Sequence, residues 1–113
     1  DDGTFTCFDL LKCLFNLSDK EIEVLRKLPA DKARTATQVA KLVSRDRSTA
    51  YRALEKLVAC SLVIKERKGG KTRGFSNVYH RVPDRELYVK ADENLDRCYG
   101  KIKKVLKETS PAN

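Results

Sequence analysis

The stretch SRDRSTAYRALEKL, residues 44–57, decides the fold of this 113-residue chain. The buried stripe of an amphipathic helix is predicted by Ala50, Leu54, Leu57 and Val58, which fall at i, i+4, i+7 and i+8. Asp46 stands at the start of that helix, where its carboxylate can accept from backbone N–H groups of the first turn. The remaining side is basic and rich in hydroxyl groups. Such a face either stays solvated or binds a polyanion.

Two helix-start signals precede this stretch. Ser18 and Glu21 form an S-x-x-E capping box, and Thr35 and Gln38 repeat the box as T-x-x-Q. Apolar residues at helical spacing follow each box. The inward-facing candidates are Ile22, Leu25 and Leu28 in one helix and Val39, Ala40, Leu42 and Val43 in the other. Residues 5–16 predict a further, strongly apolar helix that other elements must cover.

After the basic helix, the spacing of apolar residues changes from a helical to an extended pattern. SLVIKERK at 61–68 and FSNVYHRV at 75–82 read as strands, and they flank GGKTRG at 69–74. Three glycines in those six residues indicate a turn. The pattern therefore predicts a β-hairpin with a basic tip.

A long helix is predicted at the end of the chain. It begins after Pro83, with Asp84 as a candidate cap, and runs to about residue 108. About 24 residues give a helix of roughly 36 Å, and a domain this small is scarcely that wide. We therefore expect the helix to pair with its copy in a homodimer, with the 5–16 helix alongside. The dimerisation candidates are Leu87, Leu95, Tyr99, Ile102 and Leu106. The alternative is a helix that bends at Gly100 and curls back over its own domain.

The positive charge is concentrated in one third of the chain. The formal net charge is +8. Residues 34–73 hold eleven Lys and Arg against three Asp and Glu, whereas the other residues carry 13 of each sign. This surplus coincides with the basic helix and the hairpin. It favours a polyanionic partner over a membrane or a basic protein.

The predicted elements follow the order of a winged helix-turn-helix: helix, helix, short helix, turn, helix and hairpin. The fold class is mostly α with a small β-hairpin wing (α+β), with long terminal helices for dimerisation. We expect a single domain over residues 1–113. Its parts are an N-terminal packing or dimer helix at 5–16, the winged helix-turn-helix at 17–83 and a C-terminal dimerisation helix at 84–108.

The segment TATQVAKLVSRDRSTAYRALEKLVACSLVIKERKGG, residues 35–70, resembles the DNA-binding domain of archaeal and bacterial winged-helix regulators of the TrmB and MarR type. The resemblance covers residues 17–83 and includes R-S-T-x-Y-R-x-L in the recognition helix. It implies transcriptional regulation through sequence-specific binding of double-stranded DNA. Ser44 and Ser61 depart from the family pattern, which usually has glycine at both positions. We expect no separate effector domain in a chain of this length, so sugar sensing is not implied.

DNA contacts are expected on two elements. The recognition helix, about 46–59, should lie in the major groove, and the wing, about 65–76, on the backbone or in the minor groove. The base-reading candidates are Arg47, Ser48, Thr49 and Arg52. The candidates for backbone contact are Lys41, Arg45, Lys56, Lys68, Lys71 and Arg73, of which Arg73 would probe a narrow minor groove. The expected target of the homodimer is a pseudo-palindromic operator.

Two other functions stay open. Winged helices also act as protein-interaction modules of transcription complexes. Cys7, Cys13 and Cys98 would suit a thiol-redox-responsive regulator. An enzyme is not expected, because His80 is the only histidine and no catalytic constellation forms around it. We expect a cytoplasmic protein with no cofactor, no metal and no membrane contact. Its effector, if any, and the sign of regulation are left open.

Overall fold

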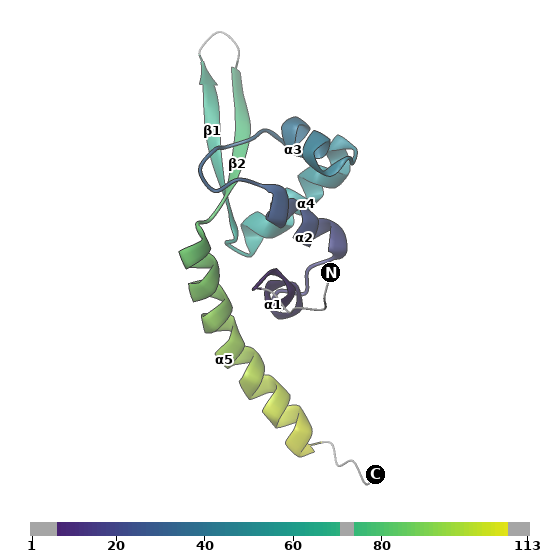
Figure 1. Cartoon of the computed structure of the whole chain (residues 1–113), viewed down its shortest axis with the longest axis vertical. Helices are drawn as coiled ribbons and strands as arrows, with labels where there is room; N and C mark the ends of the chain where they lie inside the picture. The colour runs from purple at the N-terminus through teal and green to yellow at the C-terminus, as the bar shows by residue number, and fades with distance from the viewer. Residues whose placement is uncertain (1–6, 71–73, 109–113) are drawn as a thin grey trace.

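The computed structural model describes residues 7–70 and 74–108, which form a winged helix-turn-helix followed by a long helix (Figure 1). The chain is mostly helical with a two-stranded antiparallel hairpin, so the predicted fold class is confirmed. The elements are α1 (Cys7–Leu14), α2 (Asp19–Lys27), α3 (Ala36–Val43), α4 (Arg47–Ala59), β1 (Val63–Gly70), β2 (Gly74–Arg81) and α5 (Asp84–Glu108).

The capping boxes start α2 and α3 as predicted. In α2, Ser18 Oγ accepts from Glu21 N at 3.2 Å, and Glu21 Oε1 accepts from Ser18 N at 2.9 Å. Thr35 and Gln38 make the same two bonds in α3, at 3.2 and 2.9 Å. Each pair satisfies two backbone N–H groups that have no partner within the helix.

Two serines adopt the left-handed backbone conformation. Ser44, the C-cap of α3, has φ of 55°, and Ser61, shortly after α4, has φ of 63°. These are the two positions at which the family pattern has glycine, the residue that adopts this conformation at the lowest cost. The chain therefore makes both turns with a residue less suited to them.

The hairpin extends closer to its tip than the sequence predicted. β1 pairs with β2 from Val63 opposite Arg81 to Gly70 opposite Gly74. The glycines assigned to the turn thus lie in the strands. A Cβ at Gly69 would lie 2.2 Å from the Gly74 carbonyl oxygen, so the two backbones approach more closely there than a side chain permits. This close approach lets the ladder continue where a turn was expected.

An extended residue before α3 adds to the edge of the hairpin. Tyr79 N donates to Arg34 O at 2.7 Å, and Arg34 N donates to Tyr79 O at 2.8 Å. The sequence did not predict this bridge. It fixes Tyr79 of β2, which is 1% exposed, against the α2–α3 loop.

The hydrophobic core lies where the helices meet the base of the hairpin. Ala50, Leu54 and Leu57 are fully buried and Val58 packs half-buried against the core, which confirms the predicted stripe of α4. Leu42 was expected to face inward but is 38% exposed, so that prediction is wrong. It lies beyond the edge of the inner face of this short helix. That face consists of Ala36, Val39, Ala40 and Val43.

Helix α5 extends away from the body of the domain and does not curl back over it (Figure 1). The molecule measures 67 × 29 × 25 Å as a result. Only its first turns pack on α1, with Leu87 3% and Ala91 4% exposed. Leu87 therefore belongs to the core of its own chain, which corrects its prediction as a dimer contact. Asp84 is the first residue of α5 and not its cap, and it accepts from Arg81 Nη1 at 2.8 Å.

Candidate nucleic-acid interface

Tertiary contacts divide the recognition helix α4 into an inner side, an outer side and two flanks. The inner side consists of Ala50, Ala53, Leu54 and Leu57. Ser48 and Arg52 are exposed on the opposite, outer side. Arg47 lies on the flank toward the hairpin, and Lys56 lies on the flank toward α2. The basic residues of α4 thus do not share a single face.

The flank toward α2 is partly neutralised by carboxylates. Lys56 Nζ lies 3.8 Å from Glu21 Oε1, and Arg45 Nη2 lies 3.8 Å from Glu23 Oε1. The two cations remain 40% and 42% exposed, so they can still meet a phosphate. Exposed pairs of this kind contribute about 0–1 kcal/mol to stability and are easily exchanged.

Thr49, a predicted base reader, takes part in the cap of α4. Its backbone N donates to Asp46 Oδ2 at 3.3 Å, and its hydroxyl donates to Asp46 Oδ1. The hydrogen bond from the hydroxyl lowers the pKa of Asp46 below its ordinary value. The predicted cap is confirmed, and the Thr49 hydroxyl is occupied by it.

A cleft of about 250 Å³ separates the hairpin-facing flank of α4 from β2. We call it the wing cleft. Arg47 and Tyr51 line it from α4, Thr37 from the first turn of α3, and Asn77 and Tyr79 from β2. Tyr51 is 41% exposed, so its ring borders the cleft instead of the core. The cleft therefore carries one permanent cation and several neutral donors.

Glu55 connects the recognition helix to the wing at the base of this region. Its Oε2 accepts from the Tyr79 hydroxyl at 3.1 Å and from Lys65 Nζ at 3.2 Å. Burial, and then the Glu55 carboxylate, raise the pKa of Tyr79 to about 12. The sequence did not predict the contact between Glu55 and Tyr79, because these residues are 24 positions apart and belong to different elements.

The two faces of the hairpin differ. Residues directly opposite in the ladder have side chains on the same face. Lys65 is opposite Tyr79 and Arg67 is opposite Asn77, so this face is the one that meets α4. Phe75 follows on the same face, and the Arg67 guanidinium lies 4.8 Å from the centre of its ring. Arg67 and Phe75 were not among the predicted contacts.

Lys68 belongs to the other face of the hairpin. It lines a shallow hollow with Glu66, His80 and residues of the α2–α3 loop. His80 Nε2 lies 3.9 Å from Glu66 Oε1. Lys71 and Arg73, the other predicted wing contacts, lie outside the described residues.

The outer part of α5 carries an exposed apolar stripe. Leu95 is 44% exposed, Tyr99 60%, Ile102 58% and Leu106 69%. Val105 continues the stripe at 57%. These side chains lie beyond the part of α5 that packs on α1, so the described part of the chain leaves them uncovered.

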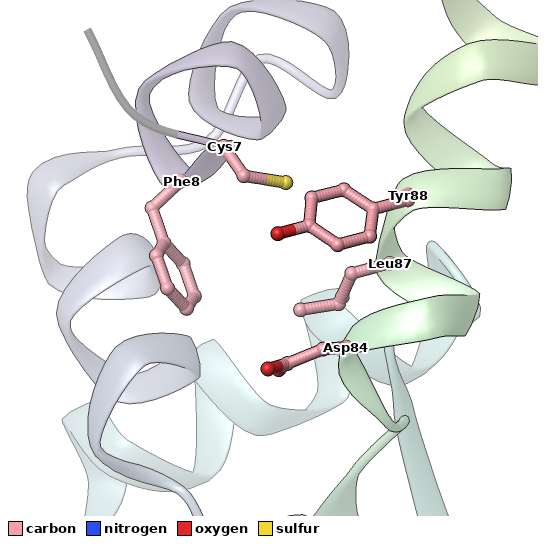
Figure 2. A pocket seen from close by; sticks show the side chains of 5 residues that line it. All are labelled: Cys7, Phe8, Asp84, Leu87 and Tyr88. Atoms are coloured by element: carbon pink, nitrogen blue, oxygen red, sulfur yellow. The ribbon is translucent and has the colours of Figure 1, made fainter.

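A small hollow of about 70 Å³ marks the junction of α1 and α5 (Figure 2). The Cys7 thiol points across it toward Tyr88, above Leu87 and Asp84. Burial raises the pKa of the Cys7 thiol, and the nearby Asp84 carboxylate raises it further. A raised pKa reduces the fraction of reactive thiolate. The environment of Cys7 therefore does not favour a redox-responsive site.

Residues 7–70 and 74–108 contain neither a cluster of metal-ligating side chains nor a membrane-spanning helix. No group of three or more His, Cys, Asp or Glu side chains there is arranged to hold a metal ion. Among the helices of that part of the chain, none is both long and apolar enough to span a membrane.

Comparisons with known proteins agree with this architecture. The family model described as the sugar-specific transcriptional regulator TrmB matches residues 11–85, from α1 to the start of α5. An uncharacterised protein of Methanocaldococcus jannaschii is 33% identical over 102 residues, which are 90% of this chain and 84% of that protein.

Solved structures show the same fold at lower identity. A possible transcriptional regulator from Methanosarcina mazei Go1 is similar with a TM-score of 0.78 at 19% identity, over 92% of this chain and 88% of that one. A MarR-family transcriptional regulator from Silicibacter pomeroyi is similar with a TM-score of 0.50 at 19% identity, over 93% of this chain and 81% of that one. The predicted winged helix-turn-helix is thereby confirmed.

Proposed function

The chain belongs to the TrmB family of transcriptional regulators, and from this premise we propose that it binds duplex DNA as a homodimer through α4 and the wing. One observation carries the proposal. The whole positive surplus of the sequence lies in residues 34–73, which include α3, α4 and the first strand of the hairpin, β1. Each basic contact to a phosphate releases condensed counterions, so a concentrated basic surface supports DNA affinity.

Base reading in this proposal falls to the outer side of α4. Arg52 and Ser48 are exposed there, on the side opposite the core. An arginine can donate two hydrogen bonds to the N7 and O6 atoms of guanine, whereas serine pairs with several bases. Arg52 is therefore the proposed main source of sequence preference, with Ser48 beside it.

Backbone contact in this proposal falls to cations around that side. Lys41 on α3, Arg45 in the helix-turn-helix turn and Lys56 on α4 are proposed phosphate contacts. Arg45 and Lys56, which pair with Glu23 and Glu21, are each more than one-third exposed and can exchange the carboxylate for a phosphate. We leave Lys68 out of the contact set, because it lies on the face of the hairpin away from α4.

The second copy is proposed to cover the outer part of α5. The stripe of Leu95, Tyr99, Ile102 and Leu106 is the apolar surface it would bury. The helix is also divided by charge: residues 84–96 carry five acidic and two basic side chains, and residues 97–108 carry one acidic and five basic. Antiparallel pairing places opposite charges side by side, whereas parallel pairing juxtaposes like charges. The pair would present two recognition helices to a pseudo-palindromic operator.

Selection of bound duplexes from a random library tests the proposal. We expect a selected motif with two related half-sites about one helical turn apart, and affinity that falls steeply with salt. Absence of binding to any duplex at low salt would remove DNA from the proposal and favour a protein-interaction module. A selected motif without two-fold symmetry would contradict the homodimer.

A further inference from the structure

We infer that the wing cleft holds a single sugar-phosphate strand of the duplex, with Arg47 and Arg67 as its two phosphate contacts. The inference rests on the proposed function and assigns to the cleft a partner of defined chemistry, a phosphodiester backbone. It changes the role of Arg47, which the sequence placed among the base readers. It also adds Arg67, which the sequence did not single out.

The position of the cleft gives the first reason. In B-DNA, one sugar-phosphate strand separates the major groove from the neighbouring minor groove. The cleft lies between α4 and β2, so it separates the helix proposed for the major groove from the wing. When α4 enters the major groove and the hairpin reaches the adjacent minor groove, the strand between the grooves passes through the space that separates them.

The chemistry of the walls gives the second reason. Arg47 supplies a permanent cation from α4, Asn77 an amide from β2 and Thr37 a hydroxyl from α3. Phosphate and sugar oxygens accept from these side-chain types in protein–DNA complexes. The cleft volume of about 250 Å³ far exceeds the ~10–15 Å³ that a single water needs.

The Glu55 carboxylate, which would repel a phosphate, is already satisfied. It accepts from the Tyr79 hydroxyl at 3.1 Å and forms an ion pair with Lys65 at 3.2 Å. Lys65 offsets its negative charge, and the bond from Tyr79 directs one of its oxygens toward the hairpin. The net charge of the groups around the cleft therefore stays positive through Arg47.

Arg67 lies outside the cleft, on the hairpin face that it shares with Asn77. It lies opposite Asn77 in the ladder, and its guanidinium stacks 4.8 Å from the centre of the Phe75 ring. A guanidinium over an aromatic face is held by the quadrupole of the ring and keeps its outer N–H groups free to donate. Phe75 is 64% exposed, so the stack stands at the surface where a strand leaving the cleft would meet it.

Neighbouring cations on opposite faces of β1 provide a matched test. Arg67→Ala and Lys68→Ala each remove one positive charge from adjacent positions of one strand. Affinity for a mixed-sequence duplex is measured for the full chain over a range of salt concentrations, with circular dichroism to verify folding. We expect Arg67→Ala and Arg47→Ala each to reduce the slope of log affinity against log salt by roughly 0.9, and Lys68→Ala to leave it unchanged. Equal effects of Arg67→Ala and Lys68→Ala, or unchanged slopes in both arginine variants, would overturn the inference.

A second comparison separates phosphate contact from base reading. Arg47→Ala should lose affinity by the same factor on the selected operator and on mixed-sequence DNA. A loss confined to the selected operator would assign Arg47 to a base and overturn its place in the cleft. If the unaltered protein bound no duplex at low salt, the proposed function itself would fail, and this inference with it. If instead the unaltered protein bound DNA and the arginine variants showed an unchanged salt slope, only the assignment of the cleft would fail, and the proposed function would stand.

Discussion

The Tyr79 hydroxyl donates to the Glu55 carboxylate across 3.1 Å, and this bond joins the wing to the recognition helix. Tyr79 is also held by two backbone bonds to Arg34. Three hydrogen bonds of one buried residue, Tyr79, to Glu55 and Arg34 therefore orient the hairpin relative to α4. Because the wing cleft lies between these elements, the same bond sets its width.

Loss of that hydroxyl should destabilise the fold below pH 10, and this destabilisation should disappear at alkaline pH. Tyr79→Phe is expected to reduce the free energy of unfolding by about 1–2 kcal/mol, as for a partly buried hydrogen bond to a charged acceptor. Folding raises the pKa of Tyr79 from 10.0 to about 12, so the neutral phenol is favoured in the folded state. Its contribution is complete below pH 10 and is lost as the pH rises toward 12.

Urea unfolding at several pH values, with tyrosinate absorbance, measures this contribution. The destabilisation by Tyr79→Phe should shrink between pH 10 and 12, and the variant should lack an absorbance step near pH 12. Tyr88→Phe, at an exposed ring on α5, serves as the control and should change neither quantity. A constant difference between Tyr79→Phe and the unaltered protein across this range would contradict the assignment.

Glycine should stabilise the chain at two serines. Ser44 and Ser61 have φ of 55° and 63°, a conformation that costs an L-residue about 1–2 kcal/mol. After the greater flexibility of glycine in the unfolded chain is subtracted, Ser44→Gly and Ser61→Gly should each raise the free energy of unfolding by about 0.5–1 kcal/mol. Glu93→Gly, in the regular helix α5, should lower it by a similar amount. Thermal or urea unfolding measures the sign of the change in the free energy of unfolding. Destabilisation by both serine substitutions would show that Ser44 and Ser61 are not strained.

Arg52 should determine sequence preference. Arg52→Ala is expected to reduce the free energy of binding by about 1–3 kcal/mol on the selected operator and by much less on mixed-sequence DNA. The measurement is a competition titration of Arg52→Ala with both duplexes at one salt concentration. Equal losses on the two duplexes would show that Arg52 contacts only phosphate.

Charge in the apolar stripe of α5 should produce monomers. Leu95→Glu and Ile102→Glu place a carboxylate where the second copy is proposed to pack, so light scattering should report half the mass of the unaltered protein. Arg97→Ala, on the other side of the helix, should remain dimeric. Leu87→Glu should instead unfold the chain, because Leu87 is 3% exposed in its own core. A dimer that persists in both glutamate variants would move the interface elsewhere.

Much of the fold could be predicted because its signals are local. A capping box spans four residues, so Ser18 with Glu21 and Thr35 with Gln38 marked the starts of two helices. Helical periodicity likewise identified Ala50, Leu54 and Leu57 as core. Counting charged residues along the sequence was enough to locate the positive surplus in residues 34–73.

Errors arose where periodicity stops at the edge of an element. Leu42 fits an apolar pattern, yet α3 has only two turns and its inner face excludes it. Leu87 belongs to the same stripe as Leu95, and periodicity cannot tell which part of a long helix its own domain covers. A different limit concerns Arg67 and Lys68. Local pattern does not distinguish these equally basic neighbours, and only the strand register assigns them to different faces of the hairpin.

The order of elements, the helix caps, most of the core and the location of the positive charge could be predicted from the sequence, because these features depend on residues a few positions apart. Only the tertiary structure decided how α4 is divided, with Lys56 turned toward Glu21 and Arg47 toward the wing. It also decided that Glu55 meets Tyr79. Such pairs join elements distant in the chain. Their contact depends on how the core packs and how two strands align, which no local spacing encodes.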